Sequence, residues 1–295
     1  MVLILERDIS RSLRVLIRRI TVVVSMPKVK KSRTKCEALR KHTSSVRVTS
    51  GSQGKLRTVG KTTEKFAETI VSKLRMAYSK AADGEKAIQM KRYMRDQFEF
   101  YGLSAPQRRA IDKQVLGDVT SLDAESHRQL LLLLWQQPQR EFQMCGTDLA
   151  TRYWKVLAVD GEKCKFSLDC VKELITTKGW WDTVDMLASN VVGNFVLRYP
   201  TTLVPVMEEW VEDEDMWLRR TAILHQLKAK HNTDQHRLFR MCLQCCHEKE
   251  FFIQKAIGWA LREHHKLHPQ DVTTFVQDNR DRLAKLSQRE ALKHA

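Results

Sequence analysis

The stretch FAETIVSKL, residues 66–74, decides the fold. Its apolar residues Phe66, Ile70, Val71 and Leu74 recur at the spacing of one face of an α-helix, whereas a half-buried strand would alternate apolar and polar residues. Convincing alternation occurs nowhere in the sequence. The chain also has only 11 Gly and 6 Pro, which are few turn-forming residues for a protein built from short strands. The sequence therefore predicts an all-α protein.

The helical pattern recurs from Thr63 to near the C-terminus, with short connections that carry glycine, proline or capping residues. One connection, Ser104-x-x-Gln107, has the form of a capping box with Pro106 in the first turn. No single hydrophobic helix dominates. Paired helices of this kind predict a HEAT-like helical-repeat solenoid, whose concave face suits a rod-like polyanion such as duplex DNA. The segments expected after residue 100 are about 104–117, 123–137, 139–157, 167–178, 182–198, 201–212, 214–230, 234–247, 250–267 and 269–280.

The composition is that of a globular protein. Of the 295 residues, 42% are apolar and 29% are charged, proportions that separate the chain from disordered sequences. No apolar stretch approaches the ~20 residues that a membrane-spanning helix needs, so we expect no membrane association. The seven cysteines are odd in number and lack the spacing of a secreted disulfide framework, which predicts a reducing, intracellular compartment.

Most of the positive charge lies in an N-terminal arm. Residues 1–65 hold 17 Lys and Arg against 4 Asp and Glu, whereas the rest of the chain is nearly balanced, with 34 against 31. Within the arm, 28–35 form a basic cluster of the nuclear-import or nucleic-acid-binding type, and the Ser/Thr/Gly-rich residues 42–60 indicate a flexible linker. We therefore expect a disordered basic arm over 1–62 and a helical domain over 63–295.

The first 25 residues bear on the compartment. They mix arginines with branched apolar residues, as organelle presequences do, although Glu6 and Asp8 are unusual for such a peptide. We expect the nucleus, with the mitochondrion or another organelle as the alternative. Met26 is an alternative start that would remove this segment.

Motifs for metal, cofactor or standard hydrolase chemistry are absent. Cys242, Cys245, Cys246 and His247 contain one C-x-x-C spacing, which is half of a zinc site, and no second half lies at a suitable distance. In a helical segment, cysteine behaves as a small apolar residue. The sequence also lacks a P-loop, a dinucleotide fingerprint, H-E-x-x-H and G-x-S-x-G. We therefore expect neither a metal nor a cofactor.

Aromatic and charged residues combine in three stretches at the spacing of helix pairs. Each alone is readily explained as helix packing, because tryptophan in a helix is mostly buried. In the third, however, Lys255, Trp259 and Arg262 share one helix face. Two cations beside an indole suit a surface that grips DNA phosphates and presses against a sugar or base, so both interpretations stay open. The three stretches are GWWDTVD (179–185), WLRR (217–220) and FFIQKAIGWALRE (251–263).

Within GWWDTVD the roles divide by residue. Asp182 is the expected N-cap of a helix, and Trp180 the expected core anchor. Trp181 and Asp185 are four positions apart, so they meet on one helix face. An indole beside a carboxylate indicates a site in which an aromatic face and a carboxylate act together.

The three stretches, in this order, resemble the AlkD-like DNA alkylation repair family, whose members are HEAT-like DNA glycosylases. The similarity covers about residues 87–295, and the basic arm has no counterpart in the short bacterial enzymes. Family members often have a polar pair where this chain has Ser104-Ala105, which puts one phosphate contact in doubt. The supporting motifs are Arg92-Tyr93-Met94, Phe100-Tyr101-Gly102, Pro106-x-Arg108-Arg109, Arg140-Glu141-Phe142-Gln143, KGWWDTVD, WLRRTAILHQL, KEFFIQKAIGWALRE and LSQREALKH.

The resemblance implies a role for individual residues. Asp185 corresponds to the catalytic carboxylate, and Trp181 and Trp259 to the indoles that contact the sugar. Arg220 corresponds to an arginine that holds the DNA backbone, and Tyr93 to a DNA-contacting tyrosine.

The implied activity is excision of N3- and N7-alkylated purines from duplex DNA, by a monomer and without strand cleavage. Such a purine is cationic and already a good leaving group, so a site without an obvious general acid could suffice. A fixed carboxylate could stabilise the oxocarbenium-like sugar and orient water. Two alternatives are a non-catalytic HEAT protein that binds damaged or branched DNA and a protein-binding HEAT scaffold. The complete set of Trp181, Asp185 and Trp259 is against the first, and the clustered cations against the second.

Overall fold

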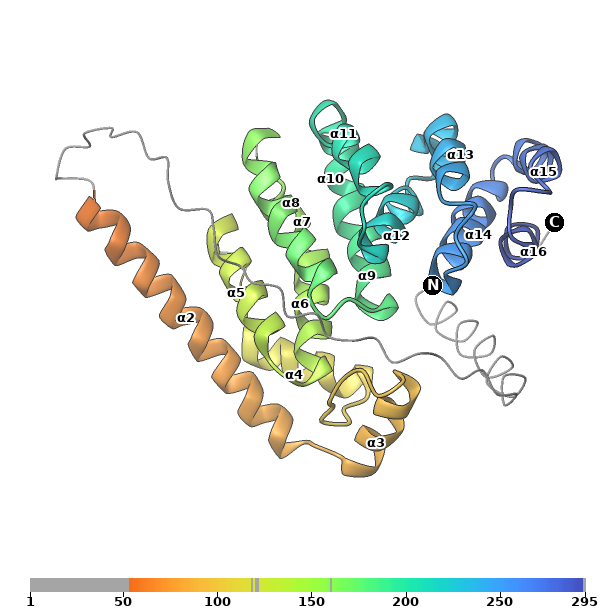
Figure 1. Cartoon of the computed structure of the whole chain (residues 1–295). Helices are drawn as coiled ribbons and strands as arrows, with labels where there is room; N and C mark the ends of the chain where they lie inside the picture. The colour runs from red at the N-terminus through yellow and green to blue at the C-terminus, as the bar shows by residue number, and fades with distance from the viewer. Residues whose placement is uncertain (1–52, 118, 120–121, 160, 294–295) are drawn as a thin grey trace. The chain divides into compact units, whose positions relative to one another are not determined.

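The structure is a computed structural model that describes residues 53–117, 119, 122–159 and 161–293, with side chains from residue 65 onward except at 161–163. Over this part of the chain every regular element is helical, which confirms the predicted all-α class (Figure 1). The elements are α2 (Gln53–Lys80), α3 (Gly84–Tyr93), α4 (Ala105–Leu116), α5 (Ala124–Gln136), α6 (Arg140–Arg152), α7 (Trp154–Leu157), α8 (Gly161–Thr176), α9 (Trp181–Leu187), the π-helical turn η1 (Ala188–Val192), α10 (Gly193–Arg198), α11 (Pro200–Trp210), α12 (Met216–Leu224), the 3-10 turn η2 (Lys230–Asn232), α13 (Gln235–Gln244), α14 (Phe251–His265), α15 (Pro269–Asp278) and α16 (Lys285–Ala291).

The helices pack in two layers. In the first layer α4, α6, α9, α12, α14 and α16 contact one another in that order, and the second layer begins with α2, α5, α8 and α11. Figure 1 shows the helices of the domain following one another in a row from α2 to α16. Contact between helices of neighbouring repeats is the arrangement of helical-repeat proteins, so the predicted repeat fold is confirmed.

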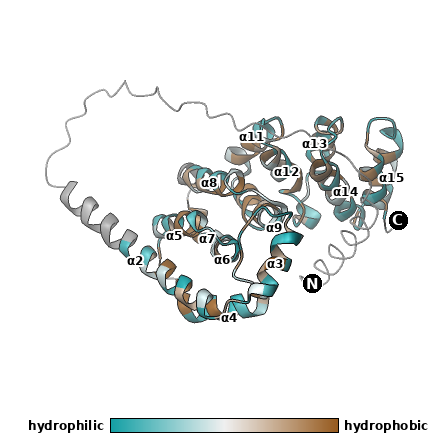
Figure 2. Ribbon diagram, turned by 60° about the horizontal axis from the view of Figure 1, so that its bottom comes forward, coloured by the Kyte–Doolittle hydropathy of each residue, from teal (hydrophilic) through white to brown (hydrophobic). Residues whose placement is uncertain are grey.

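A continuous hydrophobic core lies between the layers. Ile70, Val71 and Leu74 of the first helical pattern are buried in it, as their spacing predicts. Phe66 shares their face but is 43% exposed, because the N-terminal part of α2 extends past the helices against which it packs (Figure 1). In Figure 2, hydrophobic and hydrophilic residues occupy different sides of the helices, which is the pattern of elements that bury one face.

Helix α2 begins at Gln53, inside the predicted linker and ten residues before Thr63. Lys55, Leu56 and Arg57 have high helix propensity, and a helix can extend beyond the residues that anchor it. The linker prediction is therefore wrong for its last residues. The rest of the predicted basic arm lies outside the described residues, and the division into arm and domain stays a prediction.

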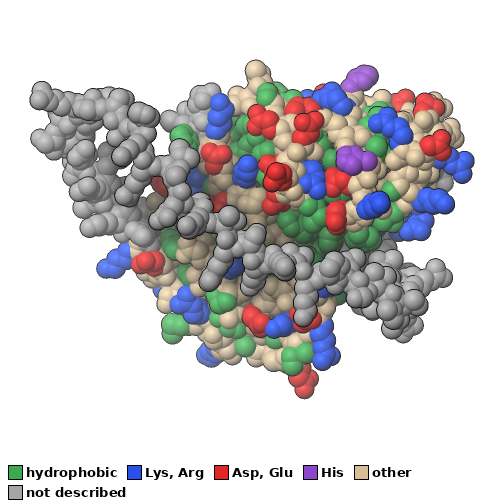
Figure 3. Space-filling view, viewed as in Figure 1, with side chains coloured by type: hydrophobic (Ala, Val, Ile, Leu, Met, Phe, Trp, Pro, Cys, Tyr) green, Lys and Arg blue, Asp and Glu red, His purple; other side chains and the backbone are tan. Residues whose placement is uncertain are grey.

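Charge on the face of the helical domain seen in Figure 3 is mixed rather than segregated. The space-filling view in Figure 3 shows Lys and Arg side chains interspersed with Asp and Glu over the helices in view. This agrees with the nearly balanced charge of the chain beyond residue 65. DNA binding by this domain must therefore depend on local groups rather than on its net charge.

The loop between α3 and α4 is fixed by one buried carboxylate. Glu141 Oε1 accepts hydrogen bonds from the backbone N–H groups of Tyr101, Gly102 and Leu103, at 2.9, 2.9 and 3.3 Å. Gly102 has a φ of +86°, and a side chain there would meet the Asp83 carbonyl oxygen at 2.0 Å, so only glycine fits. These contacts hold the loop against Asp83 at the start of α3 and against Glu141 of α6.

The capping box predicted at the start of α4 is confirmed. Ser104 is the N-cap residue, and its backbone N–H donates to Gln107 Oε1 at 3.2 Å. Pro106 lies in the first turn, where its missing N–H has no helical partner to lose.

The segment predicted as one helix over 182–198 is a single helical run with a π-turn in its middle. Helix α9 passes into the turn three residues after Asp185, and α10 follows directly. At Gly193 the run lies against α12, since a methyl group there would be 2.2 Å from the His225 carbonyl oxygen. A π-turn inserts one residue into the helix and is common beside functional sites.

Helices α14 and α16 approach closely at Gly258. A methyl group at this position would lie 2.5 Å from Glu290 Cβ and 3.0 Å from the Ser287 carbonyl oxygen. We therefore expect Gly258→Ala to lower the free energy of unfolding by about 1–3 kcal/mol, because overpacking outweighs the better helix propensity of alanine. Gly84→Ala is the matched control, since no atom lies within 4 Å of the added methyl group. Urea denaturation that gives equal stabilities for the two variants would contradict this packing.

Candidate functional site

Helix α9 begins at Trp181, and its N-cap is Trp180 rather than the predicted Asp182. Asp182 instead lies in the first turn, where both carboxylate oxygens accept hydrogen bonds from Arg140, at 3.0 and 2.6 Å. The N-cap prediction is therefore wrong, because a tertiary ion pair takes the carboxylate that the local pattern assigned to the cap. Trp181 and Asp185 are one helical turn apart, as predicted.

Asp185 forms a bidentate ion pair with Arg220 of α12. Arg220 Nε lies 2.7 Å from Oδ1 of Asp185, and Nη2 lies 2.8 Å from Oδ2. The arginine is 1% exposed and also donates to the carbonyl of Phe252 at the start of α14. The Asp185 side chain keeps 19% of its surface exposed. The structure thus holds one carboxylate rigidly while leaving it accessible.

The ionisation of Asp185 is governed by burial and by its partner. Burial raises the pKa of this carboxyl above its ordinary value, and the guanidinium of Arg220 acts in the opposite direction. Without the charge of Arg220, burial would raise the pKa of Asp185 unopposed. The arginine is therefore the group that favours a charged carboxylate at this position.

Trp259 of α14 lies beside the same ion pair. Arg220 Cζ is 5.3 Å from the centroid of its indole, and Lys255 Nζ is 5.1 Å from it. Both are within the range of cation–π attraction, and the indole is half-buried. Asp185, Arg220 and Trp259 thus form one cluster drawn from α9, α12 and α14, as the predicted site requires.

Trp181 and Tyr93 form a second contact of the predicted site. Their ring centroids are 6.0 Å apart in an edge-to-face arrangement, with Tyr93 at the end of α3. Trp180, predicted as a core anchor, is half-buried and packs in an aromatic cluster with Trp217 and Phe252, at centroid distances of 5.8 and 5.3 Å. The adjacent residues Trp180 and Trp181 therefore pack against different aromatic groups.

Lys255 and Arg262 have an intramolecular partner that the sequence did not indicate. Lys255 Nζ lies 3.0 Å from one carboxylate oxygen of Glu290, and Arg262 Nη1 lies 3.1 Å from the other. Lys255 is 8% exposed, which leaves its ammonium little surface for a phosphate. Contact of these two cations with DNA stays a prediction, and so do the DNA contacts of Tyr93 and Arg220.

A polar contact links each helix of the first layer to the next. The sequence did not predict these contacts, because it shows which residues are charged but not which of them face each other in the fold. The sequence feature that could have revealed such a contact is a charged residue within an otherwise apolar helical segment, because a buried charge needs a partner. The contacts are Arg108 with Asp148 (α4 to α6, 2.7 Å), Arg140 with Asp182 (α6 to α9, 2.6 Å), Asp185 with Arg220 (α9 to α12, 2.7 Å), Arg220 with the Phe252 carbonyl (α12 to α14) and Lys255 with Glu290 (α14 to α16, 3.0 Å).

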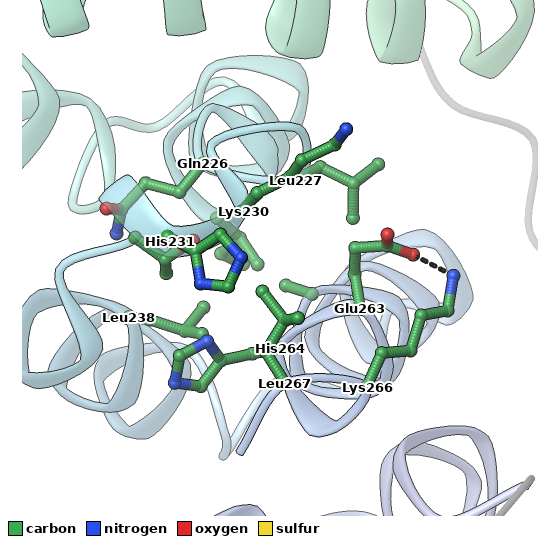
Figure 4. Close-up of a pocket in the computed structure, with 12 residues that line it drawn as sticks. Gln226, Leu227, Lys230, His231, Leu238, Glu263, His264, Lys266 and Leu267 are labelled. Atoms are coloured by element: carbon green, nitrogen blue, oxygen red, sulfur yellow. Dashed lines mark hydrogen bonds and ion pairs between the residues drawn. The ribbon is translucent and has the colours of Figure 1, made fainter.

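A cavity of about 320 Å³ lies elsewhere, between the end of α12, η2 and α14. Figure 4 shows Leu238, His264 and Leu267 among the side chains around it. None of the predicted site residues lines this cavity. The predicted site residues therefore lie outside this cavity.

The cysteine motif lies in and after α13. Cys242 and Cys245 are buried and unpaired, and burial raises the pKa of both thiols. Over residues 53–117, 119, 122–159 and 161–293, no cluster of three or more His, Cys, Asp or Glu side chains has the arrangement of a metal site. In the same part of the chain, no helix has the length and apolar character needed to cross a membrane.

Residues 74–295 match the family model described as DNA alkylation repair enzyme. The chain belongs to the DNA alkylation repair enzyme family. A solved structure described as a predicted DNA alkylation repair enzyme from Enterococcus faecalis is 34% identical, with a TM-score of 0.64 over 72% of this chain and 96% of that one. AlkD2 from Streptococcus mutans, 20% identical with a TM-score of 0.51 over 70% and 98% of the two chains, shares the fold. No protein with a curated description matches.

Membership of the DNA alkylation repair enzyme family confirms the predicted resemblance. It places the protein in DNA alkylation repair, with DNA as its substrate. The match covers all helices from the C-terminal part of α2 onward, including every residue of the predicted site.

Proposed function

We propose that this protein is a monofunctional DNA glycosylase that hydrolyses the N-glycosidic bond of N3- and N7-alkylated purines in duplex DNA. The observation that carries the proposal is the bidentate pair of Asp185 and Arg220, in which a rigid carboxylate stays 19% exposed beside Trp259. Positive charge that develops on a deoxyribose during bond cleavage is the charge that a preorganised carboxylate stabilises.

The leaving group explains why one carboxylate suffices. Alkylation at N3 or N7 makes the purine cationic, so the base departs as a neutral molecule without protonation by the enzyme. As the bond breaks, the sugar becomes oxocarbenium-like. Asp185 stabilises this cation and orients the water whose oxygen bonds to C1′ and whose proton is released. The products are the free base and an abasic site.

The aromatic residues complete the proposed site. The indole faces of Trp181 and Trp259 attract the cationic sugar and exclude bulk water from it. Arg220 holds both oxygens of Asp185, so the carboxylate is oriented before substrate arrives. Because the arginine is buried, this orienting contact is its main role in the proposed mechanism.

Hydrolysis without strand cleavage is part of the proposal. A lyase reaction needs a free amine that attacks C1′ as a nucleophile. Lys255 is the lysine nearest to Trp259 among the contacts of the site, and its ammonium is paired with Glu290. This pairing supports a hydrolytic rather than a Schiff-base route.

Base release from methylated duplex DNA tests the proposal directly. We expect the purified protein to release 7-methylguanine and to leave the strand intact until alkali is added. Borohydride should trap no covalent protein–DNA complex. A protein that binds the duplex but releases no base would be a non-catalytic DNA-binding member of the family, and the proposal would be wrong.

The pH dependence of excision should report Asp185. The carboxylate must be charged to act, and burial raises its pKa, so we expect the rate to fall on acidification at a pH above the ordinary titration range of aspartate. Arg220→Gln removes the group that lowers this pKa, and its acidic limb should therefore move to higher pH. The check is the single-turnover rate of both proteins, measured from acidic to neutral pH. Superimposable limbs for wild type and Arg220→Gln would contradict this assignment.

A further inference from the structure

The C-terminal helix α16 contributes a second buried carboxylate beside Trp259. Glu290 is 8% exposed and contacts Lys255 and Arg262, which precede and follow the tryptophan on α14. The lysine ammonium lies 5.1 Å from the indole centroid. Glu290 therefore acts on the surroundings of Trp259 through the two cations.

Two further contacts hold Glu290 in place. The Ser287 hydroxyl donates to the Gln254 carbonyl at 2.9 Å, and Gly258 allows the two helices to approach at the level of Glu290 Cβ. Such an approach leaves little freedom for the carboxylate to turn toward solvent. Its position is thus determined by helix packing as well as by charge.

The charges around the predicted site are unequal. Arg220, Lys255 and Arg262 carry three positive charges, whereas Asp185 and Glu290 carry two negative charges. Without Glu290, three cations would face one carboxylate. A sugar that becomes cationic against Trp259 would then be repelled more strongly.

The ionisation of Glu290 fits this arrangement. Burial raises its pKa, but the contacts with Lys255 and Arg262 outweigh that effect, and the net result is a pKa below the ordinary value for glutamate. The carboxylate therefore stays charged through the neutral pH range.

We propose that Glu290 is a positioning residue of the excision site, whose carboxylate holds and neutralises Lys255 and Arg262 so that the sugar can become cationic against Trp259. This inference rests on the proposed glycosylase function. It also gives α16 a role in positioning the site, although no residue of this helix belongs to the site predicted from the sequence.

Substitutions at Glu290 separate this role from a merely structural one. Glu290→Gln keeps the shape and removes the charge, whereas Glu290→Asp keeps the charge. Glu290→Gln combined with Lys255→Gln removes one cation together with the carboxylate. Glu263→Gln is the matched control, because Glu263 lies on α14 and pairs with the exposed Lys266.

The measurements are the single-turnover rate of 7-methylguanine release and the Kd for the same duplex. We expect Glu290→Gln to lower the rate about tenfold, the factor that about 1.4 kcal/mol represents, through the added repulsion between unit charges. Its Kd should be equal to or lower than that of wild type, because the site is more positive. The double variant and Glu290→Asp should recover most of the rate, and Glu263→Gln should match wild type.

Several outcomes would overturn the inference. A Glu290→Gln variant with the wild-type rate would show that the charge does not matter. A variant that loses rate and affinity together, with no recovery in the double variant, would show that Glu290 only supports the fold. Both outcomes require active wild-type protein, whereas inactive wild-type protein overturns the proposed function and this inference with it.

Discussion

Asp185→Asn is expected to lower the single-turnover rate of 7-methylguanine release by a factor on the order of 10² to 10³, the usual effect of removing one preorganised electrostatic group from an active site. Asparagine keeps the shape of the side chain but carries no charge to stabilise the sugar cation. Binding of the alkylated duplex should change much less, because DNA affinity depends mainly on contacts with phosphates. Base release at saturating enzyme, measured alongside Kd, distinguishes the two effects.

The stability of this variant needs a matched control, because Asp185→Asn also leaves Arg220 buried without its ionic partner. Glu248→Gln serves this purpose. Glu248 forms the same type of bidentate pair with Arg219, the residue next to Arg220 on α12, at 2.9 and 2.7 Å. We expect this control to retain excision within a few-fold. If both variants lose activity equally, the loss reflects the packing of α12, and the catalytic assignment of Asp185 is wrong.

Arg140→Leu is expected to have the largest effect on stability, lowering the free energy of unfolding by about 3–5 kcal/mol. Arg140 is 0% exposed, and its guanidinium contacts both oxygens of Asp182, the Lys178 carbonyl and the Thr183 hydroxyl. Its Cζ also lies 3.8 Å from the centroid of the Phe98 ring. The substitution leaves a buried carboxylate uncompensated at the start of α9, the helix that carries Asp185.

Urea denaturation measures this effect, and two further variants interpret it. Arg240→Leu breaks an exposed pair with Glu208 and should change stability by no more than about 1 kcal/mol. Arg140→Leu combined with Asp182→Leu removes both buried charges and should recover part of the loss. A loss of less than about 1 kcal/mol in Arg140→Leu would show that this pair does not anchor α9.

Local patterns in the sequence predict much of this molecule because helices depend on near neighbours. The spacing of Ile70, Val71 and Leu74 predicts a buried face, and Ser104 with Gln107 predicts a cap, and both are confirmed. Asp182 shows the limit of such reasoning. Its local pattern is that of a cap, but the stronger tertiary pair with Arg140 determines its position.

At the candidate site, too, local sequence predicts some features and only tertiary packing decides others. Trp181 and Asp185 share a helix face by spacing alone, and the motifs around them resemble those of the family. The partners of the charged residues could not be read in this way. Lys255 and Arg262 look like phosphate ligands in the sequence, yet both contact Glu290, which lies 28 residues or more further along the chain.

The sequence by itself determined the all-α class, the helical repeat and the family, and it predicted the residues of the candidate site. These follow from spacing of 3.6 residues per turn and from motifs that are contiguous in the chain. Only the tertiary structure decided which charge pairs with which: Asp185 with Arg220, Asp182 with Arg140, and Glu290 with Lys255 and Arg262. The physical reason is that a buried charge requires a partner, and the packing of one helix on the next decides which group is near enough to supply it.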